Sequence, residues 1–265
     1  MNKTNTPFRY DYVGSFLRPA ALKQARADFQ SGRIDAAALK AVEDDAIRDL
    51  VAKQKAAGYH VITDGEFRRA TWHLDFMWGF HGVGHTPTKT GLPFQGEAAM
   101  LDDTYLTGKV SVDEHPFVEH FRFVKALEDE NTVAKLTIPA PSMLHLIPCV
   151  RGKATYRPIE RYADESVLFD DIVEVYRDAV RAFYDLGCRY LQFDDTSWGE
   201  FCDPAKREAY AAEGIDVDQV AKSYVDAINR ILEAKPEDMT ITTHICRGNF
   251  RSTWFSSGGY EPIAE

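Results

Sequence analysis

A histidine and a cysteine lie two positions apart in the stretch "TTHICRGNF", as His244 and Cys246. The run before them, residues 239–243, is rich in β-branched residues and predicts a strand. Side chains at positions i and i+2 of a strand point to the same side, so the pair could hold one zinc ion. The spacing alone is unspecific, because a free cysteine is usually a small buried hydrophobic residue. The choice between a metal pair and chance neighbours depends on the rest of the chain.

Further polar residues follow predicted strands in the same way. They are Ser15, Asp64, Glu66, Ser142, Asp194 and Asp195. These are the residue types that a site for a thiol or an amino acid would use. Strand-to-helix turns also prefer Ser and Asp as helix N-caps, and that preference alone explains about half of them.

The elements that would position these residues alternate between helix and strand. Apolar periodicity predicts helices at 35–57, 117–128, 164–186 and 217–234. Strands are predicted at about 10–16, 59–64, 134–139, 189–194 and 240–246. This alternation is typical of a parallel sheet, either open and doubly wound or closed as a (β/α)8 barrel. No G-x-G-x-x-G motif follows the first strand, and the polar strand ends favour the barrel, whose active sites lie at those ends.

The segment 71–112 interrupts this alternation. It is rich in glycine, histidine and aromatic residues, and "YLTGKVSV" at 105–112 predicts a strand within it. We interpret the segment as a long excursion over the barrel mouth, where such loops often form lids or binding loops. A hydrophobic plug, or a contact between the subunits of a homo-oligomer, is an equal alternative.

Composition excludes several classes of protein. The 265 residues are 45% hydrophobic and carry a net charge of −10, which disfavours a nucleic-acid partner. No apolar run is long enough for a membrane span, and the N-terminus lacks the apolar core of a secretory signal. The four cysteines, Cys149, Cys188, Cys202 and Cys246, do not predict a disulfide framework in a chain of this length. We therefore expect a protein of the reducing cytoplasm.

Five short motifs occur in order along the chain. They are "VGSFLRP" (13–19), "DGEFRR" (64–69), "IPAPS" (138–142), "LQFDDTSW" (191–198) and "THICRGNF" (243–250). Together they resemble the catalytic domain of cobalamin-independent methionine synthase, and most of all the short bacterial relatives that lack its N-terminal domain. The similarity extends from about residue 8 to the end of the sequence.

The resemblance implies a single catalytic (β/α)8 barrel domain over residues 1–265, a zinc ion, and methyl transfer to the thiol of homocysteine or a similar small thiol. His244 and Cys246 would be zinc ligands. Glu66 and Asp194 would bind the substrate ammonium group, and Ser15 would meet its carboxylate. The chemistry agrees with the residue types, because zinc deprotonates a bound thiol and carboxylates bind an ammonium group strongly. Without such a role, Glu66 could pair with Arg68 or Arg69, and Asp194 could be an N-cap or the counter-ion of a buried arginine.

The chain departs from the family pattern in three places. Asp194 is followed by Asp195-Thr196 where the family has Glu-Pro, and Cys246 is followed by Arg247-Gly248-Asn249 without a second cysteine. We expect the protein to lack the N-terminal domain that helps the parent enzyme bind polyglutamyl folate, so the donor could be methyl-folate or another compound.

The family barrel also has two more strands after the His-x-Cys strand, and these strands complete the zinc shell. The sequence reads "GGYEPIAE" there, with about six predicted strands, so we expect a truncated barrel. His81, His85 and Cys149 are the remaining candidates for a third zinc ligand, although no motif surrounds them.

Two other functions remain open. One is zinc-dependent alkyl transfer to another thiol, such as the opening of an epoxide, which would need a different site where Glu66 and Asp194 suggest an ammonium site. The other is a non-catalytic amino-acid-binding barrel fragment that has lost its metal. Metal content, measured together with thiol-dependent affinity, separates these functions.

Overall fold

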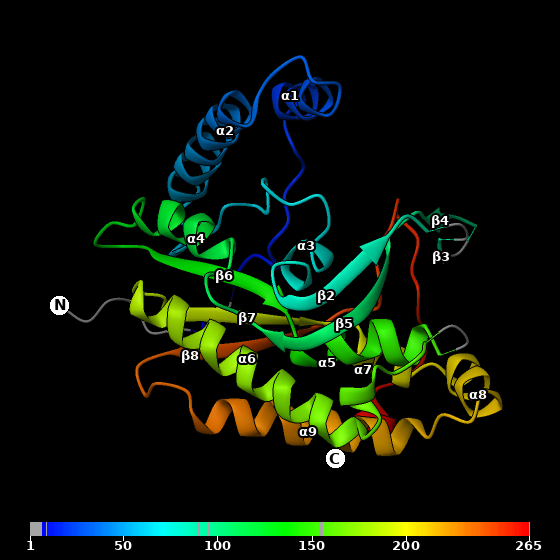
Figure 1. Ribbon diagram of the computed structural model, residues 1–265. Coiled ribbons are helices and arrows are strands. Elements are labelled where there is room, and N and C mark those ends of the chain that lie inside the picture. The colour runs from blue at the N-terminus through cyan, green and yellow to red at the C-terminus, as the bar shows by residue number, and fades with distance from the viewer. Residues whose placement is uncertain (1–6, 9, 89–90, 95, 154–155, 265) are drawn as a thin grey trace.

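The computed structural model describes residues 7–8, 10–88, 91–94, 96–153 and 156–264. A sheet of four parallel strands forms its centre (Figure 1). The strands follow one another in chain order, as β1 (Val61–Ile62), β6 (Val133–Pro139), β7 (Tyr190–Asp195) and β8 (Thr240–Ile245). In the register, Pro139 pairs with Asp194 and Asp194 pairs with His244, so three strands end at one level. Residues that follow these strands therefore lie along a single edge of the sheet.

The four predicted helices are confirmed, each preceding a strand of this sheet. They are α2 (Ala36–Ala56), α4 (Phe117–Lys125), α6 (Glu165–Asp185) and α9 (Val217–Glu233). Asp35 caps α2 by accepting a hydrogen bond from the Ala38 N–H at 2.8 Å. After α2 and α6 the chain turns at Gly58 and Gly187, which have φ angles of 82° and 90°. Helices α6 and α9 lie side by side and cover the same side of the sheet (Figure 1).

The predicted strand at 10–16 is wrong, because the backbone of these residues follows an irregular path. Side chains from the sheet bind its backbone: Lys135 Nζ donates to Tyr12 O, and Gln192 Nε2 donates to Val13 O at 2.7 Å. These side chains bind carbonyl oxygens that would otherwise accept hydrogen bonds from a neighbouring strand. The described parallel strands accordingly form an open four-stranded sheet, where the sequence predicted about six strands of a truncated (β/α)8 barrel.

The segment 71–112 forms one short helix and two antiparallel hairpins. They comprise α3 (Leu74–Met77), β2 (His81–Thr86), β3 (Leu92–Pro93), β4 (Ala98–Ala99) and β5 (Asp103–Ser111). Strand β2 pairs with β5, which confirms the strand predicted at 105–112, and β3 pairs with β4. The β3–β4 hairpin stands away from the four-stranded sheet, beyond the tip of β2 (Figure 1).

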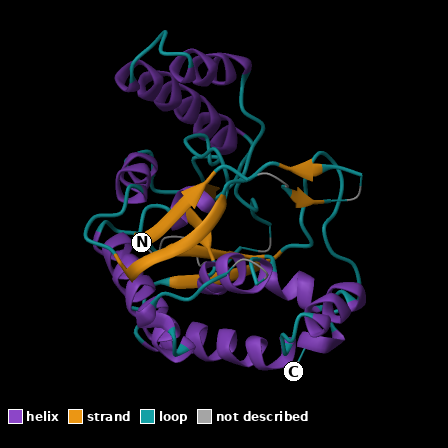
Figure 2. Cartoon of the chain, turned by 45° about the vertical axis from the view of Figure 1, so that its right-hand side comes forward, coloured by secondary structure: helices purple, strands orange, loops and turns teal. Residues whose placement is uncertain are grey.

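The remaining elements surround these parts. They are α1 (Ala20–Gln30), α5 (Pro141–His145), the π-helical turn η1 (Leu146–Arg151), the 3-10 turns η2 (Glu160–Tyr162) and η3 (Glu261–Ile263), α7 (Ser197–Phe201) and α8 (Pro204–Ala212). Helices α1 and α2 form a pair that projects from the body of the molecule (Figure 2). None of the helices in the described ranges is long and apolar enough to cross a membrane.

Candidate functional site

A cavity of about 630 Å³ lies at the C-terminal ends of the parallel strands. Its walls include all five residues singled out as site residues, namely Ser15, Glu66, Asp194, His244 and Cys246. They come from the N-terminal segment, the loop after β1, the end of β7, and β8 with the turn after it. The chain folding thus brings together side chains that lie up to 231 positions apart, between residues 15 and 246.

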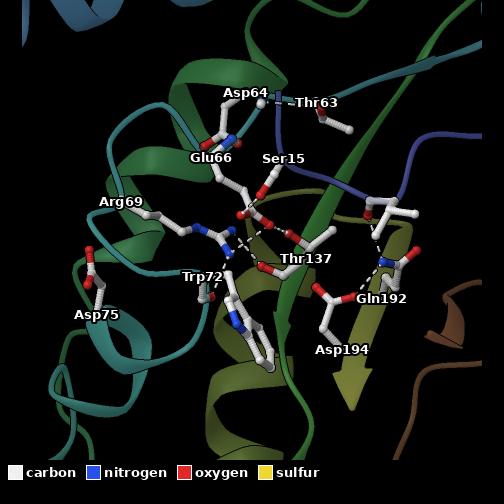
Figure 3. Close-up of polar contacts among 12 residues, drawn as sticks. Ser15, Thr63, Asp64, Glu66, Arg69, Trp72, Asp75, Thr137, Gln192 and Asp194 are labelled. Carbon is white, nitrogen blue, oxygen red and sulfur yellow. Dashed lines mark hydrogen bonds and ion pairs between the residues drawn. The ribbon is translucent and has the colours of Figure 1, made fainter. Parts of the chain in front are cut away.

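Glu66 is held in place by hydrogen bonds at both carboxylate oxygens (Figure 3). Oε1 accepts from the Thr137 hydroxyl at 2.9 Å, and Oε2 accepts from the Ser15 hydroxyl. Its backbone has a φ of 58°, a left-handed conformation that is uncommon for a residue other than glycine. The Glu66 N–H donates to Asp64 Oδ1 at 2.9 Å, so the Asp64 side chain stabilises this turn. Backbone strain of this kind persists where surrounding contacts impose it, and it is common at functional sites.

Two arginines of the "DGEFRR" loop have different partners. Arg69 lies 3.4 Å from Glu66 Oε1 and donates to the carbonyl oxygens of Thr137 and Trp72 at 2.6 and 3.2 Å (Figure 3). The ion pair that served as the alternative interpretation of Glu66 therefore exists, and it coexists with the cavity-facing position of the carboxylate. Arg68 instead pairs with acidic residues of α2, Glu43 and Asp44.

Gly14 allows the close approach of the N-terminal segment to Glu66. A Cβ atom at this position would lie 2.8 Å from Glu66 Oε1 and 3.0 Å from the Thr137 Cγ2 methyl group. Such contacts are too short for a carbon atom, so any larger residue would displace Glu66 or the segment. The glycine of "VGSF" is explained by packing against the site.

Asp194 is buried at the end of β7, and its two oxygens differ. Oδ1 accepts from Gln192 Nε2 at 2.7 Å, whereas none of the described residues donates a hydrogen bond to Oδ2 (Figure 3). Burial, together with the negative charge of Glu66, raises the pKa of Asp194 to about 7. Asp194 caps no helix, and its Oδ2 atom can therefore accept a hydrogen bond from a ligand.

Asp195 and Ser142, the neighbouring polar strand ends, bind each other. The Ser142 hydroxyl donates to Asp195 Oδ2 at 2.5 Å, and the Ser197 N–H donates to Oδ1 at 2.7 Å. Neither residue lines the cavity. Their polar character is explained by the junction between the strand ends and the short helices α5 and α7.

His244 and Cys246 are less firmly held than the carboxylates. Cys246 accepts a hydrogen bond at Sγ from the Gly248 N–H, at 3.3 Å, and its own N–H donates to Asp195 O at 2.9 Å. Burial lowers the pKa of His244 and raises that of Cys246. At neutral pH the imidazole is therefore neutral, with a lone pair free for a metal, while the thiol keeps its proton until a metal or a base removes it.

His244 and Cys246 are donor types that bind zinc, but two protein ligands are fewer than a catalytic zinc site normally has. A catalytic zinc site normally has three protein ligands, and no group of three or more His, Cys, Asp or Glu residues suited to a metal ion occurs in the described ranges. The three further candidates lie elsewhere: His81 binds Asp113, His85 binds Asp102, and Cys149 is buried. None of the three lines the cavity.

Sequence reasoning missed the residues that complete the walls and the floor. The walls include Arg18, Trp72, Phe94, Arg151 and Phe255. Arg18 donates to Glu66 O at 2.8 Å, and the half-buried Arg151 pairs with the buried Glu200.

Lys135 and Gln192 lie behind Asp194, and they were also missed. Both occur within apolar strand sequences, "VAKLTIP" and "YLQFDD", where a buried polar residue was the available signal.

A second cavity of about 730 Å³ adjoins the first. The two share His73, Leu92, Leu101 and Arg151 in their walls. Burial, with the positive charge of Arg151, lowers the pKa of His73 to about 3, so this histidine is neutral. The hairpins of 71–112 and the turn η1 supply most of the lining, which places the excursion beside the site.

Comparison with known proteins gives close and distant relatives. The chain is 41% identical over 259 residues to the Bacillus subtilis (strain 168) protein YxjH, covering 98% of this chain and 67% of YxjH. It matches the crystal structure of a candidate vitamin-B12-independent methionine synthase from Listeria monocytogenes with a TM-score of 0.76 and 39% identity, covering 93% of this chain and 67% of that one.

A distant relative carries a more specific name. The 5-methyltetrahydropteroyltriglutamate–homocysteine methyltransferase of Yersinia enterocolitica is 23% identical over 238 residues, which cover 90% of this chain and 29% of that enzyme. No family model matches the sequence.

Proposed function

Since the chain belongs to the family of YxjH and of the Listeria candidate vitamin-B12-independent methionine synthase, we propose that it is a methyltransferase acting on the thiol of a small amino acid such as homocysteine. One observation carries this proposal. Ser15, Glu66, Asp194, His244 and Cys246 come from separate parts of the chain and line one cavity. This set provides partners for an ammonium group, a carboxylate and a thiol at the same time.

The carboxylates would bind the ammonium group of the substrate. Asp194 lines the cavity with its Oδ1 bonded to Gln192, and Glu66 lies close enough for its charge to act on Asp194. An ammonium group between them would form charge-assisted hydrogen bonds and offset the mutual repulsion of the two carboxylates. Because the Ser15 hydroxyl already binds Glu66, we assign the substrate carboxylate to the backbone of the Ser15 turn, with the Arg18 guanidinium as its charge partner.

The thiol would then extend toward His244 and Cys246. A zinc ion held there would lower the pKa of a coordinated thiol and so create a nucleophile. The protein itself would orient the thiol by binding the other end of the substrate, which is a proximity effect. The zinc ion is a separate part of the proposal, because the described residues supply two metal donors, His244 and Cys246, and no third.

The methyl donor would reach the thiol from the adjoining cavity. That cavity shares Arg151 and His73 with the site, and the name of the Yersinia relative specifies a methyl-pteroyl donor. The consecutive order of the parallel strands is that of a barrel wall, so we further propose a (β/α)8-type single catalytic domain.

Calorimetric titration with and without zinc tests the function. L-homocysteine should bind more tightly than 4-mercaptobutanoate, the same thiol without the ammonium group, and methionine should form when a methyl-folate donor is added. Equal affinity for both thiols would contradict the amino-acid site. Tight homocysteine binding without methionine formation under any metal condition would instead favour the non-catalytic binding protein, which the two-donor metal set also fits.

A further inference from the structure

A lysine is buried behind the site, within the four-stranded parallel sheet. Lys135 lies in the middle of β6, and its side chain is 0% exposed. Nζ donates to Asp11 Oδ2 at 2.9 Å, to Gln192 Oε1 at 3.0 Å and to the Tyr12 carbonyl oxygen. An ammonium group has three hydrogens to donate, so every donor of this buried cation has an acceptor. A buried charge without such partners would be strongly unfavourable.

The lysine determines which way the Gln192 amide faces. An ammonium group can only donate, so the amide must present its oxygen to Lys135. The amide nitrogen then faces Asp194 Oδ1 and Val13 O, both at 2.7 Å, and both of these are acceptors. The reversed amide would bring two acceptors against each other and two donors against each other. The orientation is therefore fixed from both sides, by Lys135 and by the N-terminal segment.

The fixed amide in turn fixes Asp194. Its nitrogen donates to Oδ1, and the other oxygen, Oδ2, points away from Gln192 (Figure 3). We propose that Lys135 and Gln192 are positioning residues that hold Asp194 with one oxygen presented to the cavity, and that this makes the site selective for ligands with an ammonium group. The inference rests on the proposed function, because it concerns how that site recognises its substrate.

The charges around Asp194 agree with this role. Glu66 faces it from the loop after β1, Lys135 from β6, Arg69 from the same loop as Glu66, and His244 from the neighbouring strand. Arg69 pairs directly with Glu66, whereas Lys135 reaches Asp194 through the Gln192 amide. Each carboxylate thus has a cation behind it, and none of the described cations forms a direct ion pair with Asp194. An incoming ammonium group would supply that missing partner.

Asp11 anchors the lysine from the opposite side. Its Oδ2 accepts from Lys135 and also from the Tyr190 hydroxyl at 2.6 Å. The positioning chain therefore runs from the N-terminal segment through β6 and β7 to the site. A variant that changes Lys135 and Asp11 together removes both buried charges at once and leaves the hydroxyl of Tyr190 with an acceptor.

Two variants test the proposal by the affinity ratio of L-homocysteine to 4-mercaptobutanoate. Gln192→Glu keeps the shape and the Lys135 contact, but sets an acceptor against Asp194 Oδ1. Lys135→Met with Asp11→Asn removes the cation that holds the amide oxygen, so that Val13 O and Asp194 Oδ1 alone orient the amide. We expect the ratio to fall about tenfold or more in each variant, because a buried charge loses its hydrogen-bonding arrangement. The affinity for 4-mercaptobutanoate should change little.

Gln54→Glu is the matched control. Gln54 is a buried glutamine of α2 that exchanges hydrogen bonds with the backbone of Thr63 and does not line the cavity. Its variant should lower the melting temperature and leave the affinity ratio unchanged. A wild-type protein that prefers homocysteine, with ratios unchanged in both test variants, would overturn the positioning role alone. A wild-type ratio near one would overturn the proposed function and this inference together.

Discussion

The two ends of the candidate site are built differently. At the carboxylate end, Glu66 has both oxygens bonded, and Asp194 is held by an amide that Lys135 orients. At the thiol end, the half-buried Cys246 accepts a long hydrogen bond at its sulfur, from the Gly248 N–H at 3.3 Å. Asp194 lies on β7, which is paired on both sides, whereas His244 lies on β8, at one edge of the four parallel strands.

This difference indicates which end of a substrate is recognised in advance. The carboxylate end is rigid before any ligand arrives, so little ordering is needed when an ammonium group binds. The thiol end offers two donors without a fixed arrangement and would gain order from a metal or a thiol. We therefore expect substitutions at the carboxylate end to have larger effects than substitutions at the thiol end.

The largest effect is expected from Asp194→Asn. An ammonium group would lose a buried carboxylate partner, so homocysteine binding should weaken by about 2–5 kcal/mol. Calorimetry should show little change for 4-mercaptobutanoate. Asp238→Asn, at the exposed pair with Arg189, is the control and should leave both affinities unaltered. If Asp194→Asn weakened both thiols equally, the role of Asp194 would be structural.

Gly14→Ala should disturb the rigid end through packing. The added methyl group would lie 2.8 Å from Glu66 Oε1, and we expect the free energy of unfolding to fall by about 1–3 kcal/mol, as for other overpacked sites. Urea denaturation measures this change. Gly108→Ala in β5 is the matched control, since its nearest neighbour, Gly82 Cα, is 3.9 Å away. Equal stability of the two variants would mean that the Gly14 contact relaxes without cost.

The pH dependence of stability should report the buried Asp194. Its pKa of about 7 exceeds the ordinary value of 3.8, so between these pH values the folded protein keeps a proton that the unfolded chain has lost. This group therefore contributes less to stability as the pH rises through that window. Asp194→Asn removes the penalty, and its stability relative to wild type should increase by about 2–3 kcal/mol between roughly pH 5 and 8. A constant difference across this range, measured by denaturation, would contradict the raised pKa.

The smallest effect is expected at the thiol end. His244→Ala should change the free energy of unfolding by less than about 1 kcal/mol, because the imidazole is only half-buried and its site is not tightly bonded. Because the described residues supply two metal donors and no third, metal analysis after dialysis against a mild chelator should find far less than one zinc per 265-residue chain. A stoichiometric zinc that His244→Ala abolishes would show that a further ligand exists.

Much of this arrangement could be predicted from local sequence. The caps and glycine stops of α2 and α6, and the apolar runs of β6, β7 and β8, give the helices and strands to within a few residues. Because parallel strands end at one edge, the polar residues after them could be expected to meet. That expectation placed Glu66, Asp194, His244 and Cys246 in one region, and the cavity contains all four.

Tertiary contacts decided the rest. Residues 10–16 read as a strand, yet Lys135, which lies 124 positions from Asp11, holds this segment in an irregular path. Which oxygen of Asp194 faces the cavity depends on the Gln192 amide, and so on the same lysine. Such long-range hydrogen bonds leave no periodic pattern in the sequence. The residue types at the site follow from the sequence alone, while their orientation is set by buried polar groups whose partners are determined only when the chain is folded.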